Sequence, residues 1–113
     1  MVNTLVRPFT IDYLAIERTW KIDCIIENRF TRLIQVYSNI QDCKIRVANI
    51  ARQQKYQTNC SYLISISLSL PEGVNLYILR FPQPSVEDSV QKAIADAFAK
   101  IYRRLIELKF EKS

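Results

Sequence analysis

A stretch near the middle of the chain, residues 61–70, limits the fold most strongly. On one side of an extended backbone it places five large apolar residues, Tyr62, Ile64, Ile66, Leu68 and Leu70. On the other side it places Leu63 and four serines. Successive side chains of a β-strand point to opposite faces of its sheet. The alternation therefore predicts a strand in an antiparallel sheet that is covered on one face only.

Three further stretches favour strands of the same sheet. Alternating apolar residues predict strands over residues 9–16 and 42–50. The turn sequence Leu-Pro-Glu-Gly at residues 70–73 then leads into a fourth strand over residues 74–81, which completes a hairpin. Residues 51–59 are polar and aperiodic, so we expect a loop there.

Two stretches have the spacing of amphipathic helices. Thr19 is placed to cap the first, which continues to about residue 38. In the second, over residues 86–110, apolar residues recur at steps of three and four without an internal Gly or Pro. Ser85 is the expected cap of this final helix.

The element order is therefore β-α-β-β-β-α, in one α+β domain over residues 1–113 of which residues 1–8 can be flexible. Strands joined through a helix run parallel, and a following meander is antiparallel. We expect a four-stranded mixed sheet with two helices packed on one face. The expected core comprises Ile26, Phe30, Leu33, Ile45, Val47, Ile64, Ile66, Leu68, Ile78, Ile94, Phe98 and Ile101.

Residue usage argues against several kinds of chemistry. The chain has no His and one Gly, which disfavours the common zinc sites, a Ser-His-Asp triad, a P-loop and a dinucleotide fingerprint. Its carboxylates show no shared spacing that would make a catalytic pair. We therefore expect no enzyme activity, no cofactor, no metal and no small-molecule substrate.

The cysteines and the apolar stretches indicate the compartment. Cys24, Cys43 and Cys60 are odd in number and lie in apolar runs, so we expect buried, reduced thiols rather than disulfides. No stretch has the length of a membrane span or a secretory signal. The sequence thus predicts a cytoplasmic protein that does not enter a membrane.

A net charge of +5 favours an anionic partner, and nucleic acid is one class of such partners. The candidate RNA-binding residues are, on the helices, Arg29, Arg32, Lys92, Lys100, Arg103 and Arg104, and, on the strands and the loop, Lys44, Arg46, Arg52, Lys55 and Arg80. The alternative is a solvated helix face with ion pairs at i, i+4. In that case Asp96 pairs with Lys100, and Arg103 pairs with Glu107.

Several motifs occur together in an order that resembles a known family. They are the segment Arg-Phe-Thr-Arg-Leu at residues 29–33, followed by Tyr37 and Ile40, the Leu-Pro-Glu-Gly turn, and the final-helix residues Ala93, Ile94, Ala97, Phe98, Lys100, Arg103 and Leu105. From about residue 10 to residue 112, their spacing is similar to that of the ribosome hibernation promoting factors. These are also described as ribosome-associated inhibitors or sigma-factor modulation proteins.

The resemblance implies a bacterial factor that docks in the mRNA/tRNA channel of the small ribosomal subunit. There it inhibits translation or promotes ribosome hibernation as part of a stress response. At matched positions the resemblance implies that Arg29, Arg32, Lys100 and Arg103 contact ribosomal RNA, whose phosphates attract such charges. Long family members carry a further C-terminal domain that pairs ribosomes, so this chain is not expected to join two ribosomes by that route.

Two alternatives to ribosome binding stay open. The first is a protein-interaction module of the same fold, with a homodimer formed through the serine-rich sheet face. The second is an enzyme, for which the residues offer no nucleophile and base pair. Ribosome binding predicts co-sedimentation that weakens with salt, whereas the interaction module predicts a stable oligomer that ignores RNA.

Overall fold

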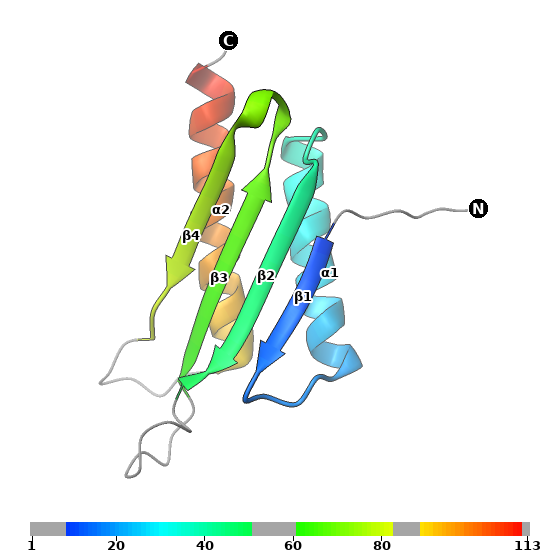
Figure 1. Ribbon diagram of the computed structural model, residues 1–113, viewed down its shortest axis with the longest axis vertical. Helices are drawn as coiled ribbons and strands as arrows, with labels where there is room; N and C mark the ends of the chain where they lie inside the picture. The colour runs from blue at the N-terminus through cyan, green and yellow to red at the C-terminus, as the bar shows by residue number, and fades with distance from the viewer. Residues whose placement is uncertain (1–8, 51–60, 83–88, 112–113) are drawn as a thin grey trace, which may run out of the picture.

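The computed structural model describes residues 9–50, 61–82 and 89–111. Along the chain its elements are β1 (Phe9–Leu14), α1 (Trp20–Val36), β2 (Asp42–Asn49), β3 (Tyr62–Ser69), the short 3₁₀ turn η2 (Pro71–Gly73), β4 (Asn75–Arg80) and α2 (Val90–Glu111) (Figure 1). The predicted order β-α-β-β-β-α is confirmed. The predicted loop at residues 51–59 and the amino-terminal residues 1–8 lie outside the described residues.

The four strands form one sheet in the order β1-β2-β3-β4. β1 runs parallel to β2, with Phe9 opposite Cys43, because α1 carries the chain back between them. β2, β3 and β4 follow as an antiparallel meander, in which Ile45 lies opposite Ile66 and Ile66 opposite Ile78. The mixed sheet that the sequence predicted is therefore confirmed.

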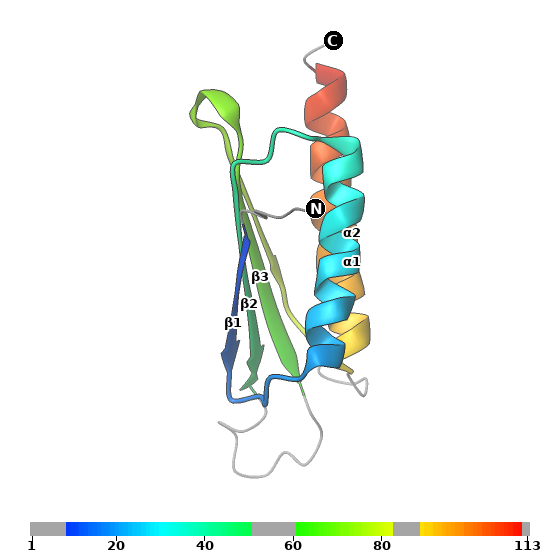
Figure 2. The same ribbon diagram turned by 90° about the vertical axis from the view of Figure 1, so that its right-hand side faces the viewer.

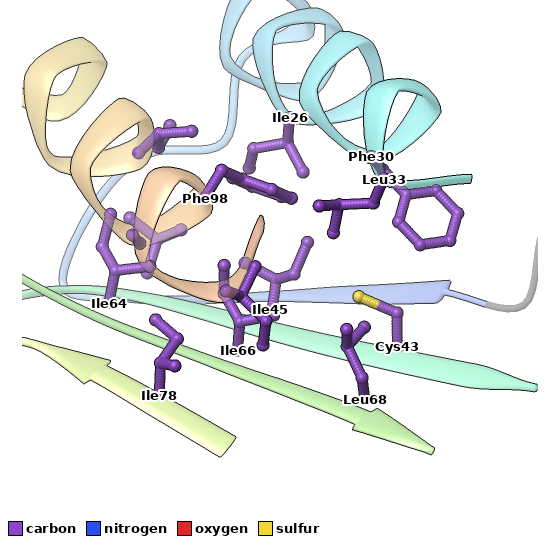
Figure 3. Close-up of a cluster of buried hydrophobic side chains, with 14 of the residues drawn as sticks. Ile26, Phe30, Leu33, Cys43, Ile45, Ile64, Ile66, Leu68, Ile78 and Phe98 are labelled. Atoms are coloured by element: carbon purple, nitrogen blue, oxygen red, sulfur yellow. The ribbon is translucent and has the colours of Figure 1, made fainter. Parts of the chain in front are cut away.

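Both helices pack on the same face of this sheet, which gives the molecule two layers (Figure 2). Side chains of α1 and α2 meet alternate side chains of the strands between the layers, as Figure 3 shows for Phe30, Phe98 and Ile66. The rings of Phe9 on β1 and Phe30 on α1 are in contact there, tilted by 39° with their centroids 4.8 Å apart. All twelve residues predicted for the core are buried.

Short polar side chains fix where the helices begin. The hydroxyl of Thr19 accepts a hydrogen bond from the backbone N–H of Ile22 at 3.2 Å, as predicted. At the second helix the hydroxyl of Ser89 accepts from the N–H of Lys92 at 3.1 Å. α2 therefore begins four residues later than predicted, with Ser89 in the place expected for Ser85, which lies outside the described residues.

The turn between β3 and β4 contains a left-handed backbone. Glu72 has φ 66° and Gly73 has φ 73°. Glycine adopts this region without the steric cost that a side chain brings. The one glycine of the chain thus stands where the hairpin needs left-handed geometry.

The cysteines behave differently from one another. Cys43 on β2 is fully buried, as predicted, whereas Cys24 is exposed because it lies on the side of α1 turned away from the sheet. The prediction of a buried thiol is therefore wrong for Cys24. Cys60 lies outside the described residues.

Candidate nucleic-acid interface

Arg29 and Arg32 lie one turn apart on the flank of α1 that is turned toward α2. Phe30 and Leu33 are buried on the sheet side of the helix, so a rotation of about 100° per residue turns their arginine neighbours to the flank. Arg29 is half-buried and Arg32 is exposed. Within the described part of the chain, neither guanidinium has an ion-pair or hydrogen-bond partner. Both charges are therefore available to a ligand.

A groove of about 400 Å³ runs between the two helices beside these arginines. Its lining comprises Arg29, Arg32, Leu33, Gln35 and Val36 of α1 with Phe98, Ala99 and Tyr102 of α2. Tyr102 is 39% exposed although it is aromatic. Sequence analysis missed this residue, whose signal is its position four residues after the buried Phe98, at the border of the apolar stripe.

The basic residues of α2 do not all share this groove. Lys100 precedes Tyr102 by two residues, a rotation of about 200°, so the two side chains leave opposite flanks of the helix. Arg104 lines a hollow with Leu76 of β4, and Lys100 lies one turn before it on the same flank. Lys100 therefore lies on a different surface from Arg29 and Arg32, although the resemblance gives all three residues the same role.

Lys92 and Arg103 occupy a third position on α2. Both are exposed, and they lie on the side opposite the buried residues Ala97 and Ile101, pointing away from the sheet. The helix layer thus presents a groove with Arg29 and Arg32, an outer side with Lys92 and Arg103, and a flank beside β4.

Lys44 and Arg46 lie on the open face of the sheet, opposite the helix layer. Both are exposed, as predicted, and Ser67 and Ser65 of β3 lie next to them in register. Arg46 and the exposed Tyr77 both line a smaller hollow of about 120 Å³. Because the sheet stands between them and the helices, Lys44 and Arg46 cannot join Arg29 and Arg32 in one flat contact.

Arg80 departs from the predicted surface role because its side chain is buried, with 4% of its surface exposed. It follows Leu76 and Ile78 on the core side of β4, as strict alternation requires. Its guanidinium donates to the backbone carbonyl of Tyr62 at 3.0 Å and pairs with Asp96 of α2 at 3.1 Å. Arg80 is a structural residue that we remove from the candidate interface.

Neither of the two ion pairs expected along α2 is found among the described residues. Asp96 pairs with Arg80 across the layers rather than with Lys100 along the helix. Arg103 and Glu107 form no ion pair in the described part of the chain. Of the remaining predicted residues, Arg52 and Lys55 lie outside the described ranges.

A polar cluster fastens β1 to the start of α1. The hydroxyl of Tyr13 donates to one carboxylate oxygen of Asp23, and Arg18 donates to the other at 3.0 Å. Burial, followed by the hydrogen bond to Asp23, raises the pKa of the Tyr13 hydroxyl well above its ordinary value. This cluster holds the helix against the edge strand and so helps to set the position of Arg29 and Arg32.

Residues 9–50, 61–82 and 89–111 contain neither a cluster of metal ligands nor a membrane-spanning helix. No three His, Cys, Asp or Glu side chains gather there as potential metal ligands. The helices described there are too short or too polar to cross a membrane.

A helix pair on one face of an open four-stranded sheet, with basic residues on the helix layer, defines a class of small α+β domain with solved representatives. The structure is similar to a ribosomal subunit interface protein from Coxiella burnetii, with a TM-score of 0.69 and 13% identity over 89% of this chain and 96% of that chain. It is also similar to the N-terminal domain of Protein Y from Thermus thermophilus, with a TM-score of 0.63 and 15% identity over 87% of this chain and 93% of that chain.

At these identities the likeness concerns the fold, and it confirms the fold that the family resemblance implied. No family model matches the sequence, and no curated protein matches it. The roles of individual residues therefore have to be argued from their own chemistry.

Proposed function

We propose that this chain is a ribosome-associated RNA-binding factor that docks in the mRNA/tRNA channel of the small subunit and inhibits translation or promotes hibernation. The observation that carries the proposal is the cationic groove of the helix layer, where Arg29 and Arg32 face solvent without a partner among the described residues. The fold, shared with a protein named for a ribosomal subunit interface, supports the same partner.

The physical basis is the release of counterions from RNA phosphates. Each arginine or lysine that neutralises a phosphate frees a condensed cation, so binding is strong at low salt and weakens steeply as salt rises. Arginine adds two parallel hydrogen bonds to phosphate, which lysine lacks. The main proposed contacts are therefore Arg29, Arg32 and Arg103. On α2, Lys92 on the outer side and Lys100 on the flank beside β4 add point charges, and Arg104 on the same flank adds a further bidentate donor.

Sedimentation of the purified protein with small subunits, at low and high salt, tests this proposal. The wild type is expected to co-sediment at low salt and to be released at high salt. Arg29→Glu with Arg32→Glu should abolish co-sedimentation, because the groove then repels phosphate. The double variant Lys44→Glu with Arg46→Glu is a matched control, since it changes net charge equally on the opposite face.

Two results would contradict the proposal. If the wild type fails to sediment with small subunits at low salt, the ribosome is the wrong partner. If both double variants lose binding equally, the effect belongs to net charge and not to the helix layer.

A second function is favoured by the apolar side chains on the opposite face. Leu14 and Tyr77 are 48% and 61% exposed on the open face of the sheet, and Phe81, at the end of β4, is 64% exposed. Such a surface suits a protein partner or a second copy of the chain. A homodimer that persists at high salt in sedimentation equilibrium, and that Tyr77→Glu dissociates, would favour this function over RNA binding.

A further inference from the structure

The groove between α1 and α2 has the chemistry of a site for one nucleotide. We propose that it holds a single unpaired nucleotide of an RNA strand, with the base against Tyr102 and the phosphate between Arg29 and Arg32. This inference rests on the proposed RNA-binding function and adds the form of RNA that the site selects.

The aromatic part of the argument concerns Tyr102. Its ring is 39% exposed at the edge of the groove, and its hydroxyl makes no hydrogen bond in the described part of the chain. A helical side chain leans toward the preceding turn, where Ala99 and Phe98 lie. Because Ala99 is small, the space beside the ring is open rather than filled. A nucleobase can stack in such a space, a contact that needs no particular base.

The charge of the groove favours the phosphate of the same nucleotide. Arg29 and Arg32 line its opposite wall, and no acidic side chain is part of the described lining. Their Cβ atoms are about 5–6 Å apart, as for any pair separated by one helical turn. Two guanidinium forks at this spacing can hold one phosphate from two sides. Arg29 is more buried than Arg32, so its side chain has less freedom to move.

The shape of the groove distinguishes an unpaired strand from a duplex. In a double helix the bases are stacked inside, so a duplex offers the arginines its phosphates but offers Tyr102 no base face. An unpaired base can turn out of its strand into the groove of about 400 Å³. Dependence of binding on the Tyr102 ring is therefore the signature of the proposed site.

Fluorescence anisotropy with a short labelled single-stranded RNA tests the site, with the duplex of the same sequence and a free nucleoside monophosphate as comparisons. Tyr102→Ala should weaken single-strand binding by about tenfold, the usual value of one stacked base. Tyr102→Phe should keep the wild-type affinity because it keeps the ring. Trp20→Ala removes an exposed aromatic at the start of α1, remote from the groove lining, and should change nothing.

Three results would overturn the inference. In the first, Tyr102→Ala binds the single strand as tightly as the wild type does. In the second, Tyr102→Ala loses duplex binding and single-strand binding to the same extent. In the third, the wild type binds the free nucleotide as tightly as it binds the strand. Circular dichroism of each variant confirms that the fold is kept.

The outcome is separable from that of the proposed function. If the wild type sediments with small subunits but Tyr102→Ala binds single strands normally, ribosome association is supported and the nucleotide site is contradicted. If the wild type does not sediment with small subunits while single-strand binding depends on Tyr102, the nucleotide site is supported and ribosome association is contradicted.

Discussion

Arg80 carries a charge into the interior because alternation along β4 places it on the core side after Leu76 and Ile78. A buried charge is tolerated when it is paired and hydrogen-bonded. Asp96 and the carbonyl of Tyr62 supply those partners, and together they join α2 to the hairpin. The same alternation is visible in the sequence, but arginine is so rarely buried that we assigned it to the surface.

Asp96→Asn should therefore destabilise the fold by about 1–2 kcal/mol, because it weakens a charge-assisted bond to a buried guanidinium. Asp12→Asn makes the same chemical change on the exposed side of β1, where no partner is found among the described residues, and should cost less than about 0.5 kcal/mol. Urea denaturation of both variants measures the difference. Equal losses would show that the pair with Arg80 does not stabilise the protein.

The buried thiol of Cys43 makes the stability of the fold depend on pH. Burial, with a smaller effect of the Asp42 carboxylate, raises the pKa of its thiol from 9.0 to about 12. The folded thiol stays protonated while the unfolded one ionises, so unfolding becomes easier as pH rises from about 9 toward about 12. Tyr13 acts in the same direction at higher pH, because its pKa is also raised.

The wild type should consequently lose more stability between neutral pH and about pH 10 than Cys43→Ala does. Urea midpoints of both proteins at the two pH values provide the measurement. Comparing pH slopes removes the constant loss that a smaller core residue brings. Parallel slopes would mean that ionisation of Cys43 does not contribute.

At the scale of elements, helix and strand types were predictable because each has its own period of apolar residues. The alternation of Ile64, Ile66 and Leu68 specified both a strand and its covered face. The start of α2 was not predictable, because Ser85 and Ser89 are both chemically able to cap a helix and the residues between them carry no periodic signal. The grouping of the basic residues was also missed, since helical spacing does not show which flank of α2 faces α1.

The observed cap yields a prediction for α2. Ser89→Ala should destabilise the protein by about 1 kcal/mol, because the N–H of Lys92 loses its acceptor. Thr19→Ala should have a comparable effect at α1, whereas Ser38→Ala, in the exposed connection after α1, should have almost none. Thermal unfolding of the three variants compares them, and an unaffected midpoint in Ser89→Ala would place the cap elsewhere.

At the scale of the whole molecule, charge is divided between two faces that the sheet keeps apart. Arg29 and Arg32 lie in the helix layer, and Lys44 and Arg46 lie on the open face. A net charge of +5 thus does not describe one uniform basic surface. The salt dependence of RNA binding reports how many of these charges act together, which net charge alone does not reveal.

Replacing Arg29 and Arg32 with Gln should lower the slope of log K against log salt by about 0.7 for single-stranded RNA, because the one phosphate held between them loses its contact. Replacing Lys44 and Arg46 with Gln should leave the slope within about 0.2 of the wild type, since those residues are outside the proposed contact. Anisotropy titrations over a range of salt concentrations measure both slopes. Equal decreases would assign RNA contacts to both faces.

The parallel pairing of β1 with β2 has a consequence for the order in which the chain assembles. β1 precedes every other described element during synthesis, yet its neighbour in the sheet follows only after α1. β3 and β4, by contrast, pair across a three-residue turn and can join as soon as both have been made. We therefore expect the sheet to begin to form at the hairpin of β3 and β4. β1, although it is translated first, is expected to be the last strand to join the sheet.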